Sequence, residues 1–298
     1  MRLRIGARLF EGPGPFLMGV VNATPDSFSD GGRFLAPEAA VAQAERLAEE
    51  GADLVDLGGE STRPGASPVE AAEERRRVVP VVERLRARGF RLPISVDTTK
   101  AEVARAALEA GADLLNDVSG LLDPALARVA AEAGAPVVLM HGRGTPATMQ
   151  GLAVYRDLLG EVAAELRQAM ARALAAGIPE ERIILDPGIG FAKTPEQSVE
   201  LLARVGELSA LGRPLLVGPS RKRFIGHLTG APVEARLPGT LAAVTACVLA
   251  GVELLRVHEV AAARQAAKVA AALRQAAPAP RGGAPGAAGK AGGPAGLG

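Results

Sequence analysis

The sequence predicts an α/β protein in which eight strand–helix units close into a (β/α)8 (TIM) barrel, with a short N-terminal strand or hairpin and a disordered C-terminal tail. Eight short apolar runs recur along the chain, the stretches between them are long enough for helices, and a glycine follows most of those helical stretches. Runs that are apolar throughout are typical of parallel strands buried on both faces. An open doubly wound sheet is the alternative, but it usually has fewer strands.

The apolar runs define the strands. About 20 to 45 residues separate consecutive runs, enough for the crossover that parallel neighbours need. Ahead of them, Arg2, Arg4 and Arg8 alternate with apolar residues, which favours a short strand or hairpin before the barrel. The predicted barrel strands are Phe16–Val21, Leu54–Leu57, Pro93–Val96, Leu114–Leu115, Val137–Met140, Ile183–Leu185, Pro214–Val217 and Leu254–Val257.

Local signals mark where the helices begin and end. Ser67-Pro68-Val69-Glu70 and Thr194-Pro195-Glu196-Gln197 each place an N-cap residue, a first-turn proline and a capping-box residue in order. Asp123-Pro124 repeats the first two of these. Helix ends are predicted where a glycine suits a left-handed C-cap, at Gly51, Gly89, Gly111, Gly134, Gly177, Gly212 and Gly251.

Composition fits one globular domain over residues 1–275. The 298 residues include 34 Lys+Arg and 33 Asp+Glu, so the formal charge is +1, which excludes a nucleic-acid binder that relies on a basic surface. Aromatic residues make up 3%, too few for a base-stacking platform. Residues 276–298 are nearly all Ala, Pro and Gly and have little to bury, which predicts a disordered tail.

The sequence also favours a cytoplasmic protein. Its one cysteine, Cys247, cannot form an internal disulfide and fits a reducing compartment. The uncharged stretch Pro238–Val252 is shorter than the roughly 20 residues that a membrane-spanning helix needs. The N-terminus lacks the continuous apolar run of a signal peptide. We therefore expect no membrane segment.

Polar residues stand at the carboxyl end of every predicted strand. In a (β/α)8 barrel these ends face one shared mouth, where barrel enzymes have their active sites. Any strand ends where polarity begins, so a single polar residue indicates little, whereas eight converging ends with acids, amides and cations indicate a site. These residues are Asn22, the run Gly58–Arg63, Asp97, Asn116, Asp117, His141, Asp186, the run Ser220–Lys222, Arg256 and His258.

The polar residues divide into two sets by charge. Asp97 and Asp186 directly follow apolar strands, so we expect half-buried carboxylates that need donors, with Asn116 beside them. A heterocycle with adjacent ring N–H and amino groups offers such donors. The alternative for each acid is a structural carboxylate that caps the next helix, and this alternative suits Asp117 better than Asp97. The second set is cationic and suits phosphate oxygens, and it comprises Arg63, Arg221, Lys222, Arg256 and His258.

Three other motifs fail on inspection. The run Gly188–Thr194 is similar to a phosphate-binding P-loop, but Ala192 occupies the place of the required glycine. The run Gly218–Lys222 lacks the last glycine of a nucleophile elbow, and Ser220 has no evident base partner. The histidines lack zinc-ligand spacing. We therefore expect neither a covalent nucleophile nor a structural zinc.

Two long runs carry a family resemblance. Residues 18–32 (MGVVNATPDSFSDGG) and 56–65 (DLGGESTRPG) closely resemble the first two signatures of the dihydropteroate synthases. The similarity continues in order through Ser95–Thr98, Asn116–Gly120, Asp186–Phe191, Ser220–Lys222 and Arg256–His258. It implies a folate-pathway transferase that joins 7,8-dihydropterin-6-ylmethyl diphosphate to 4-aminobenzoate and releases diphosphate.

The resemblance also implies roles for single residues. The pterin-binding set is Asp97, Asn116, Asp186, Lys222 and Arg256. The diphosphate set is Asn22, Thr62, Arg63, Arg256 and His258, with Asn22 also at a Mg²⁺ ion. The aminobenzoate pocket comprises Phe28, Thr62, Pro64, Phe191, Ser220 and Arg221. The catalytic residues are Asp30, Arg63, Lys222, Arg256 and His258, and Phe28, Asp30 and Arg63 lie on two loops that close over the site. A homodimer and inhibition by sulfonamides are implied as well.

The chemistry of this reaction agrees with the residues. An aromatic amine is neutral at pH 7, so the hard step is carbon–oxygen cleavage, which cations and a metal assist more than a general base does. The electron-rich pterin supports a methylene cation, which favours a dissociative path in which loop closure excludes water. We expect Asp30 to stabilise that cation.

Alternatives and departures accompany the resemblance. Glu259 stands where the family usually has Asp, Ser198 where Asn is common, and Ala192 where Gly is frequent. A corrinoid methyltransferase that uses methyltetrahydrofolate shares the acid-and-amide pocket but has no diphosphate to stabilise. A non-catalytic pterin-binding protein is the alternative from another class. The Ser220–Lys222 run and the pair Arg256 and His258 argue against the methyltransferase. The two long glycine- and proline-rich loops and the metal-side Asn22 argue against the binding protein.

Overall fold

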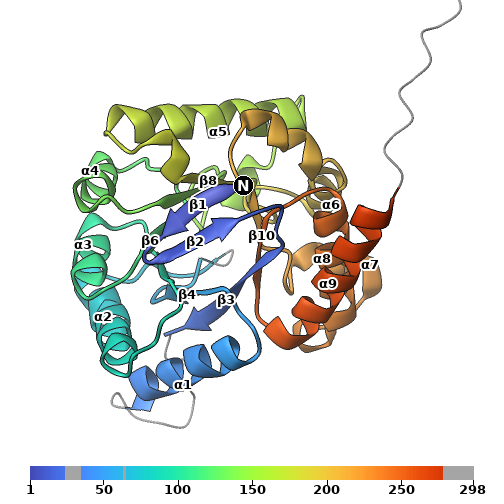
Figure 1. The fold of residues 1–298 in the computed structure, drawn as a ribbon. Helices are drawn as coiled ribbons and strands as arrows, with labels where there is room; N and C mark the ends of the chain where they lie inside the picture. Colours follow the sequence, from blue (N-terminus) through green and yellow to red (C-terminus); the bar gives the residue numbers. More distant parts are fainter. Residues whose placement is uncertain (24–34, 63–64, 278–298) are drawn as a thin grey trace, which may run out of the picture.

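The barrel of parallel strands is closed. The protein is described here by a computed structural model covering residues 1–23, 35–62 and 65–277. Eight parallel strands pair in the order β8-β7-β6-β5-β4-β3-β10-β9, and a parallel bridge between Leu185 and Leu215 joins the two ends of that row. Helices surround the ring of strands (Figure 1). The prediction of a (β/α)8 barrel is confirmed.

Each predicted strand is present, with small changes at its ends. Strand β6 runs two residues beyond its predicted end, and β9 is reduced to two residues. The barrel strands are β3 (Phe16–Asn22), β4 (Leu54–Gly58), β5 (Ile94–Asp97), β6 (Leu114–Asp117), β7 (Val137–Met140), β8 (Ile183–Asp186), β9 (Leu216–Val217) and β10 (Leu254–Val257).

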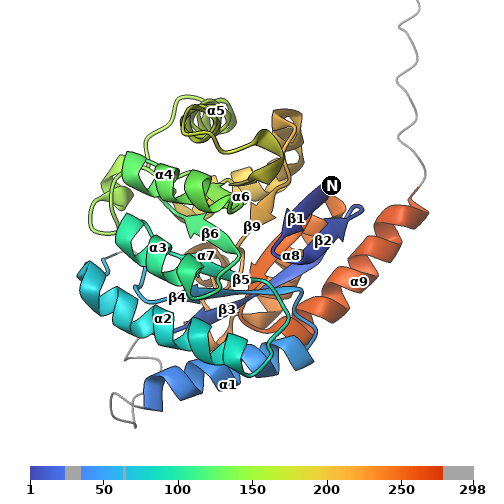
Figure 2. The same ribbon diagram turned by 60° about the vertical axis from the view of Figure 1, so that its left-hand side comes forward.

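The α-helices follow the strands along the chain, and α1 to α4 lie side by side around one part of the barrel (Figure 2). Short 3-10 helices add η2 (Met149–Leu152), η3 (Glu180–Arg182), η4 (Val205–Leu211) and η5 (Val233–Ala235). The α-helices are α1 (Leu35–Glu49), α2 (Ala71–Ala87), α3 (Ala101–Glu109), α4 (Pro124–Ala133), α5 (Leu158–Ala175), α6 (Pro195–Ala203), α7 (Arg223–Thr229), α8 (Leu237–Leu249) and α9 (Val260–Ala276).

Most of the predicted helix signals are confirmed. Asp123 caps α4, Thr194 forms a capping box with Gln197 at α6, and all seven predicted C-terminal glycines have positive φ. The predicted capping box at Ser67 is wrong, because α2 begins only at Ala71. Ahead of α2, the Val69 N–H donates to the Glu60 carboxylate, which holds this segment outside the helix.

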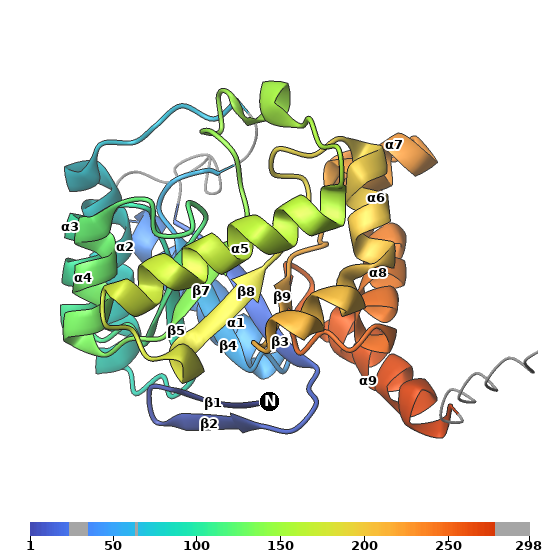
Figure 3. The ribbon, with the colours of Figure 1, turned by 90° about the horizontal axis from the view of Figure 1, so that it is seen from above.

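The N-terminal hairpin closes the end of the barrel opposite the long connecting loops (Figure 3). Strands β1 (Arg2–Ile5) and β2 (Arg8–Glu11) pair antiparallel, and Leu3, Ile5 and Phe10 are fully buried against the first interior residues of the barrel strands. Burying a side chain of this kind contributes about 1.5–3 kcal/mol relative to leaving it exposed. The hairpin therefore seals the base of the barrel and leaves its other end for polar side chains.

Helix α9 is the last element of the described residues. Helix α9 ends at Ala276, the first residue of the predicted tail. Residues 278–298 of that tail lie outside the described residues. None of the helices within the described ranges has the length and apolarity needed to cross a membrane.

Candidate active site at the carboxyl ends of the barrel strands

Side-chain alternation places a polar layer above the sealed base. Leu54, Leu114, Ile184 and Leu254 pack against the hairpin in the interior of the barrel. Because side chains alternate between the two faces of a strand, the residue two positions further along each strand also faces the interior. Those residues are Asp56, Asn116, Asp186 and Arg256, and the same alternation after Ser95 gives Asp97.

Asp56 is the centre of this layer. It is fully buried, and its carboxylate accepts hydrogen bonds from Ser95 Oγ at 2.6 Å and from Asn116 Nδ2 at 3.1 Å. Its Oδ2 also accepts from Arg256 Nε at 2.6 Å, while another nitrogen of the same guanidinium donates to Asp97 Oδ2 at 3.2 Å. One arginine therefore joins two buried acids from neighbouring strands.

Sequence reasoning missed the central position of Asp56, because the candidate residues were taken only from the strand ends. Asp56 lies inside the apolar run Leu54–Leu57. A carboxylate inside a buried strand needs donors around it. That requirement was the available signal, since it marks Asp56 as part of a polar network whichever residues supply the donors.

Asp97, Asn116 and Asp186 form what we call the floor of the barrel mouth. The two floor acids, Asp97 and Asp186, are more deeply buried than expected, at 7% exposure each. Burial and the nearby charge of Asp56 raise the pKa of Asp97 to about 7, against the opposing charge of Arg256. Burial also raises the pKa of Asp186, although the Gly188 N–H donates to that carboxylate at 2.7 Å. Burial thus disfavours both charged carboxylates, and hydrogen-bond donors from a bound ligand would offset that cost.

Phe191 and Lys222 meet beside the floor. Lys222 Nζ lies 4.4 Å from the centre of the Phe191 ring, a cation–π contact. The positive charge of Lys222 also opposes the rise in the pKa of Asp186. The two residues come from the segments after β8 and β9, so the structure brings this part of the predicted site together.

Ser220 and His258 form a second pair at the mouth. Ser220 Oγ lies 2.8 Å from His258 Nδ1, and the His258 backbone N–H donates to the same hydroxyl at 3.3 Å. Ser220 thus has an imidazole partner, which corrects the expectation that it has none. The pairing ties the segment after β9 to the end of β10, where the predicted diphosphate and aminobenzoate sets adjoin.

Arg221 is held in an unusual backbone conformation. Its φ is +56°, a left-handed value that costs a non-glycine residue about 1–2 kcal/mol. Thr240 Oγ1 accepts its backbone N–H at 3.0 Å, and Glu259 accepts from its Nε at 2.7 Å. Glu259, which replaces the usual Asp of the family, therefore fixes the guanidinium of a predicted aminobenzoate residue.

The other two departures also have a structural explanation. Ala192 has φ +47°, so it adopts the left-handed conformation that a glycine takes easily. The Ser198 hydroxyl donates to the Thr194 carbonyl at 2.8 Å inside α6. Asp117 accepts from the Ser119 N–H at 2.9 Å and from the Leu121 N–H, which agrees with a structural role in the local turn.

Some predicted site residues have few described contacts. Asn22 ends β3, half-buried, in register with Gly58, and Thr62 is half-buried at the edge of a described range. Phe28, Asp30, Arg63 and Pro64 lie outside the described residues.

An ion cluster supports the loop after β4. Lys100 pairs with both Glu60 and Glu74, and Glu74 is 1% exposed. Glu60 also accepts the Val69 N–H, so this cluster anchors both ends of the run that precedes α2. Sequence reasoning did not identify it, because Lys100 lies 40 residues from Glu60.

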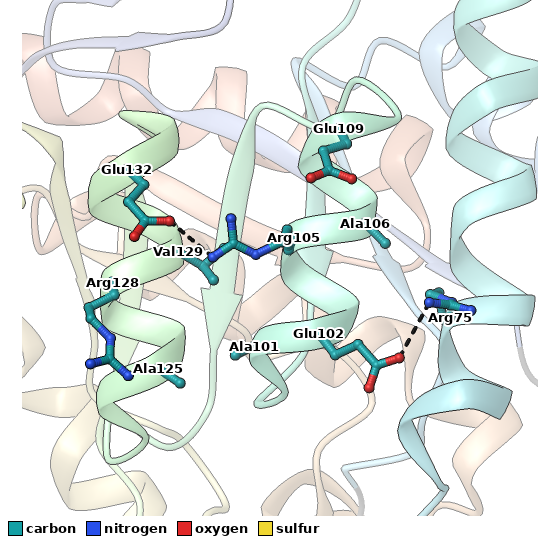
Figure 4. Close-up of a pocket in the computed structure, with 10 residues that line it drawn as sticks. All are labelled: Arg75, Ala101, Glu102, Arg105, Ala106, Glu109, Ala125, Arg128, Val129 and Glu132. Carbon is teal, nitrogen blue, oxygen red and sulfur yellow. Dashed lines mark hydrogen bonds and ion pairs between the residues drawn. The ribbon is translucent and has the colours of Figure 1, made fainter.

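A separate surface groove of about 380 Å³ lies between α3 and α4, on the outside of the barrel (Figure 4). The exposed pairs Arg105–Glu132 and Arg75–Glu102 line it. It contains none of the residues predicted for the site. Within the described ranges, His, Cys, Asp and Glu form no group of three or more that fits a metal ion.

Comparison with known proteins agrees with this fold. The dihydropteroate synthase of Synechocystis is 48% identical over 91% of this chain and 94% of its own length. The crystal structure of the Xanthomonas albilineans dihydropteroate synthase with 4-aminobenzoic acid is 49% identical and superposes with a TM-score of 0.86 over 93% of this chain and 99% of its own. The Yersinia pestis enzyme in a sulfonamide complex is 41% identical, with a TM-score of 0.87 over 93% of this chain and all of its own. The sequence model of the pterin-binding enzymes matches residues 18–258, and the chain belongs to that family.

Proposed function

We propose that this chain is an alkyl-transferring enzyme of folate biosynthesis, a dihydropteroate synthase. It joins the methylene carbon of 7,8-dihydropterin-6-ylmethyl diphosphate to the amino group of 4-aminobenzoate and gives 7,8-dihydropteroate and diphosphate. The relatives with this name support the proposal. The observation that carries it is the contact of Arg256 with both Asp56 and Asp97, because it puts a cation against the acid-and-amide floor.

The floor suits the pterin ring. Asp97, Asn116 and Asp186 present acceptors and one amide inside the barrel, and a pterin edge presents ring N–H and amino donors to them. Arg256 and Lys222 adjoin the floor and complete the proposed pterin set. A neutral heterocycle fits this place because its donors satisfy the buried carboxylates.

The departing diphosphate is assigned to Asn22, Thr62, Arg63, Arg256 and His258. The carbon–oxygen bond breaks with its electron pair on the diphosphate, and nearby cations stabilise that charge. Mg²⁺ takes oxygen ligands and is often held largely by substrate phosphates and water, so the Asn22 carboxamide oxygen would supply one protein ligand to an ion bound by the diphosphate. When bound, the ion would neutralise diphosphate charge.

The acceptor is assigned to the side of the mouth that holds Phe191, Ser220 and Arg221, with Phe28, Thr62 and Pro64 carried over from the resemblance. The amine nitrogen forms the new carbon–nitrogen bond and then loses a proton. Arg221, fixed by Glu259, offers a guanidinium to the carboxylate of 4-aminobenzoate. Asp30 and Arg63 keep their proposed catalytic roles, with Lys222, Arg256 and His258.

A turnover assay tests the proposal. The protein, Mg²⁺, dihydropterin diphosphate and 4-aminobenzoate are mixed, and released pyrophosphate and dihydropteroate are both measured. The proposal predicts equal amounts of the two products, and release only when both substrates are present. No release by a protein that still binds the pterin would favour the non-catalytic binding protein, and methyl transfer from methyltetrahydrofolate would favour the corrinoid methyltransferase.

The cytoplasmic location, the homodimer and sulfonamide inhibition belong to the same proposal. Helices α7, α8 and α9 expose Leu228, Leu249 and Leu273 by at least 47%, and we assign the dimer surface to these helices. Analytical ultracentrifugation checks the dimer, and a sulfonamide added to the turnover assay checks competition with 4-aminobenzoate.

A further inference from the structure

A buried lysine next to the site is not used by the proposed reaction. Lys193 is 2% exposed and lies in the loop between β8 and α6. Its Nζ donates to the Phe191 carbonyl at 3.0 Å and lies 2.9 Å from Nδ1 of His141, which directly follows β7. The side chain therefore fastens the loop that carries Phe191 to the neighbouring strand.

Other contacts hold the same loop in place. Gly188 has φ +69°, and a Cβ there would lie 1.9 Å from the His141 carbonyl oxygen, so the loop approaches the end of β7 too closely for any other residue. At the far end, the Tyr155 hydroxyl donates to the Ala192 carbonyl at 2.9 Å. Two consecutive carbonyls are thus each held by a side chain, that of Phe191 by Lys193 of the same loop and that of Ala192 by Tyr155 from outside it.

These contacts of Lys193 and Tyr155 fix the position of the Phe191 ring. It contacts Lys222 Nζ at 4.4 Å, next to the pterin floor, and it belongs to the proposed aminobenzoate pocket. The floor acids are held by other hydrogen bonds, because Asp97 accepts one from Arg256 and Asp186 accepts one from the Gly188 N–H. A displacement of Phe191 would therefore change the acceptor side of the mouth more than the pterin side.

The chemistry of the pair supports a specific hydrogen bond over a chance contact. Burial lowers the pKa of Lys193 to about 7. The negative charge of Asp186 opposes this change, and the positive charge of Arg143 adds to it. Burial also lowers the pKa of His141 to about 2, so its ring is neutral and keeps an acceptor nitrogen. Burying a lysine in this way is costly unless its amino group is hydrogen-bonded.

We propose that Lys193 and His141 form a positioning pair for the aminobenzoate subsite, which fixes the Phe191 ring against the aromatic acceptor. Neither residue touches the reacting atoms. The inference rests on the proposed function, because it names the subsite that the pair serves. It predicts a selective effect on one of the two substrates, which a residue that only stabilised the fold would not produce.

The test replaces Lys193 with methionine, which keeps the length of the side chain and removes its donors. Lys193→Met is expected to raise the KM for 4-aminobenzoate at least tenfold and to change the calorimetric Kd of dihydropterin diphosphate less than threefold. Lys268→Met, an exposed lysine of α9, is the matched control and leaves both constants unchanged. A folded Lys193→Met protein with the wild-type KM for 4-aminobenzoate, or with both constants weakened equally, overturns the proposal.

A second pair of variants covers a failure of Lys193→Met to fold. His141→Gln keeps an acceptor for the lysine and is expected to stay within threefold of the wild-type KM, whereas His141→Leu removes the acceptor and raises that KM as Lys193→Met does. Equal behaviour of the two His141 variants overturns the pair. If the wild-type protein releases no pyrophosphate, the proposed function fails by itself. The pair is then judged by calorimetric binding of 4-aminobenzoate in the same variants, where loss of binding only in His141→Leu supports it and unchanged binding contradicts it.

Discussion

Asp56 Oδ2 accepts a hydrogen bond from Arg256 Nε at 2.6 Å, although the two residues lie 200 positions apart in the sequence. The barrel makes this contact possible, because β10 and β4 both pair with β3 and their interior side chains meet above the sealed base. Asp56 and Asp97 raise the pKa of Arg256 against the opposing effect of its burial, so the guanidinium stays charged. The arginine is thereby oriented before any substrate arrives.

Removing the Asp56 charge should damage both stability and catalysis. Taking away one partner of a buried ion pair costs about 3–5 kcal/mol. We expect Asp56→Asn to lose about 3 kcal/mol in urea unfolding and to lower kcat/KM for dihydropterin diphosphate at least tenfold, which corresponds to about 1.4 kcal/mol. Glu132→Gln, on an exposed pair, is the control and should change neither. Wild-type kcat/KM in folded Asp56→Asn would show that Arg256 needs no such orientation.

The raised pKa of Asp97 predicts how stability depends on pH. A buried acid with a folded pKa of about 7 favours its protonated form, so the stability it contributes is present below its unfolded pKa of 3.8 and is lost as pH rises through 7. The unfolding free energy of Asp97→Asn relative to wild type should therefore increase between pH 4 and pH 7, by at least about 1 kcal/mol. Urea unfolding across this range measures it, and a difference that stays flat would contradict the raised pKa.

The Lys100 cluster should contribute far more to stability than an exposed pair does. Lys100→Met leaves Glu74, which is 1% exposed, without its cation, and the expected loss is about 3 kcal/mol. Arg105→Met breaks the Arg105–Glu132 pair, in which both side chains are more than half exposed, and should cost less than about 1 kcal/mol. Equal losses in urea unfolding would mean that burial of the carboxylate does not set the cost.

Ala192→Gly should be nearly neutral. Glycine relieves the left-handed strain at φ +47°, but it also increases the freedom of the unfolded chain. The two effects oppose each other, so we expect a change in unfolding free energy within about 1 kcal/mol and an unchanged KM for 4-aminobenzoate. Ala192→Val serves as the contrast, since a β-branched residue is strained at positive φ and should destabilise the protein. A tenfold change in KM for Ala192→Gly would mean that this methyl group shapes the pocket.

The fold was predictable from the sequence because local rules set it. Eight runs buried on both faces, such as Val137–Met140, leave few arrangements other than a parallel barrel, and capping signals such as Thr194 act within one turn. The helix start predicted at Ser67 is wrong because Glu60, which lies outside the predicted capping motif, accepts the Val69 backbone N–H. Local sequence does not show such a contact.

The site was only partly predictable. Strand ends gave Asp97, Asn116 and Asp186, since every barrel gathers those positions at one mouth. Asp56 and Lys193 were missed or set aside, because their importance comes from the strands beside them, which bring Arg256 and His141 within hydrogen-bond distance. Such contacts depend on strand order and register, which become visible only when the barrel is closed.

The proposed reaction requires one barrel mouth to hold both a pterin floor and the groups that receive diphosphate. Calorimetric binding of dihydropterin diphosphate and of the matching dihydropterin alcohol, to wild type, Asp97→Asn and His258→Leu, tests this most directly. We predict that Asp97→Asn weakens both ligands at least tenfold, and that His258→Leu weakens only the diphosphate ester. If His258→Leu binds the ester as tightly as wild type does, or weakens the two ligands equally, the proposed reaction is contradicted.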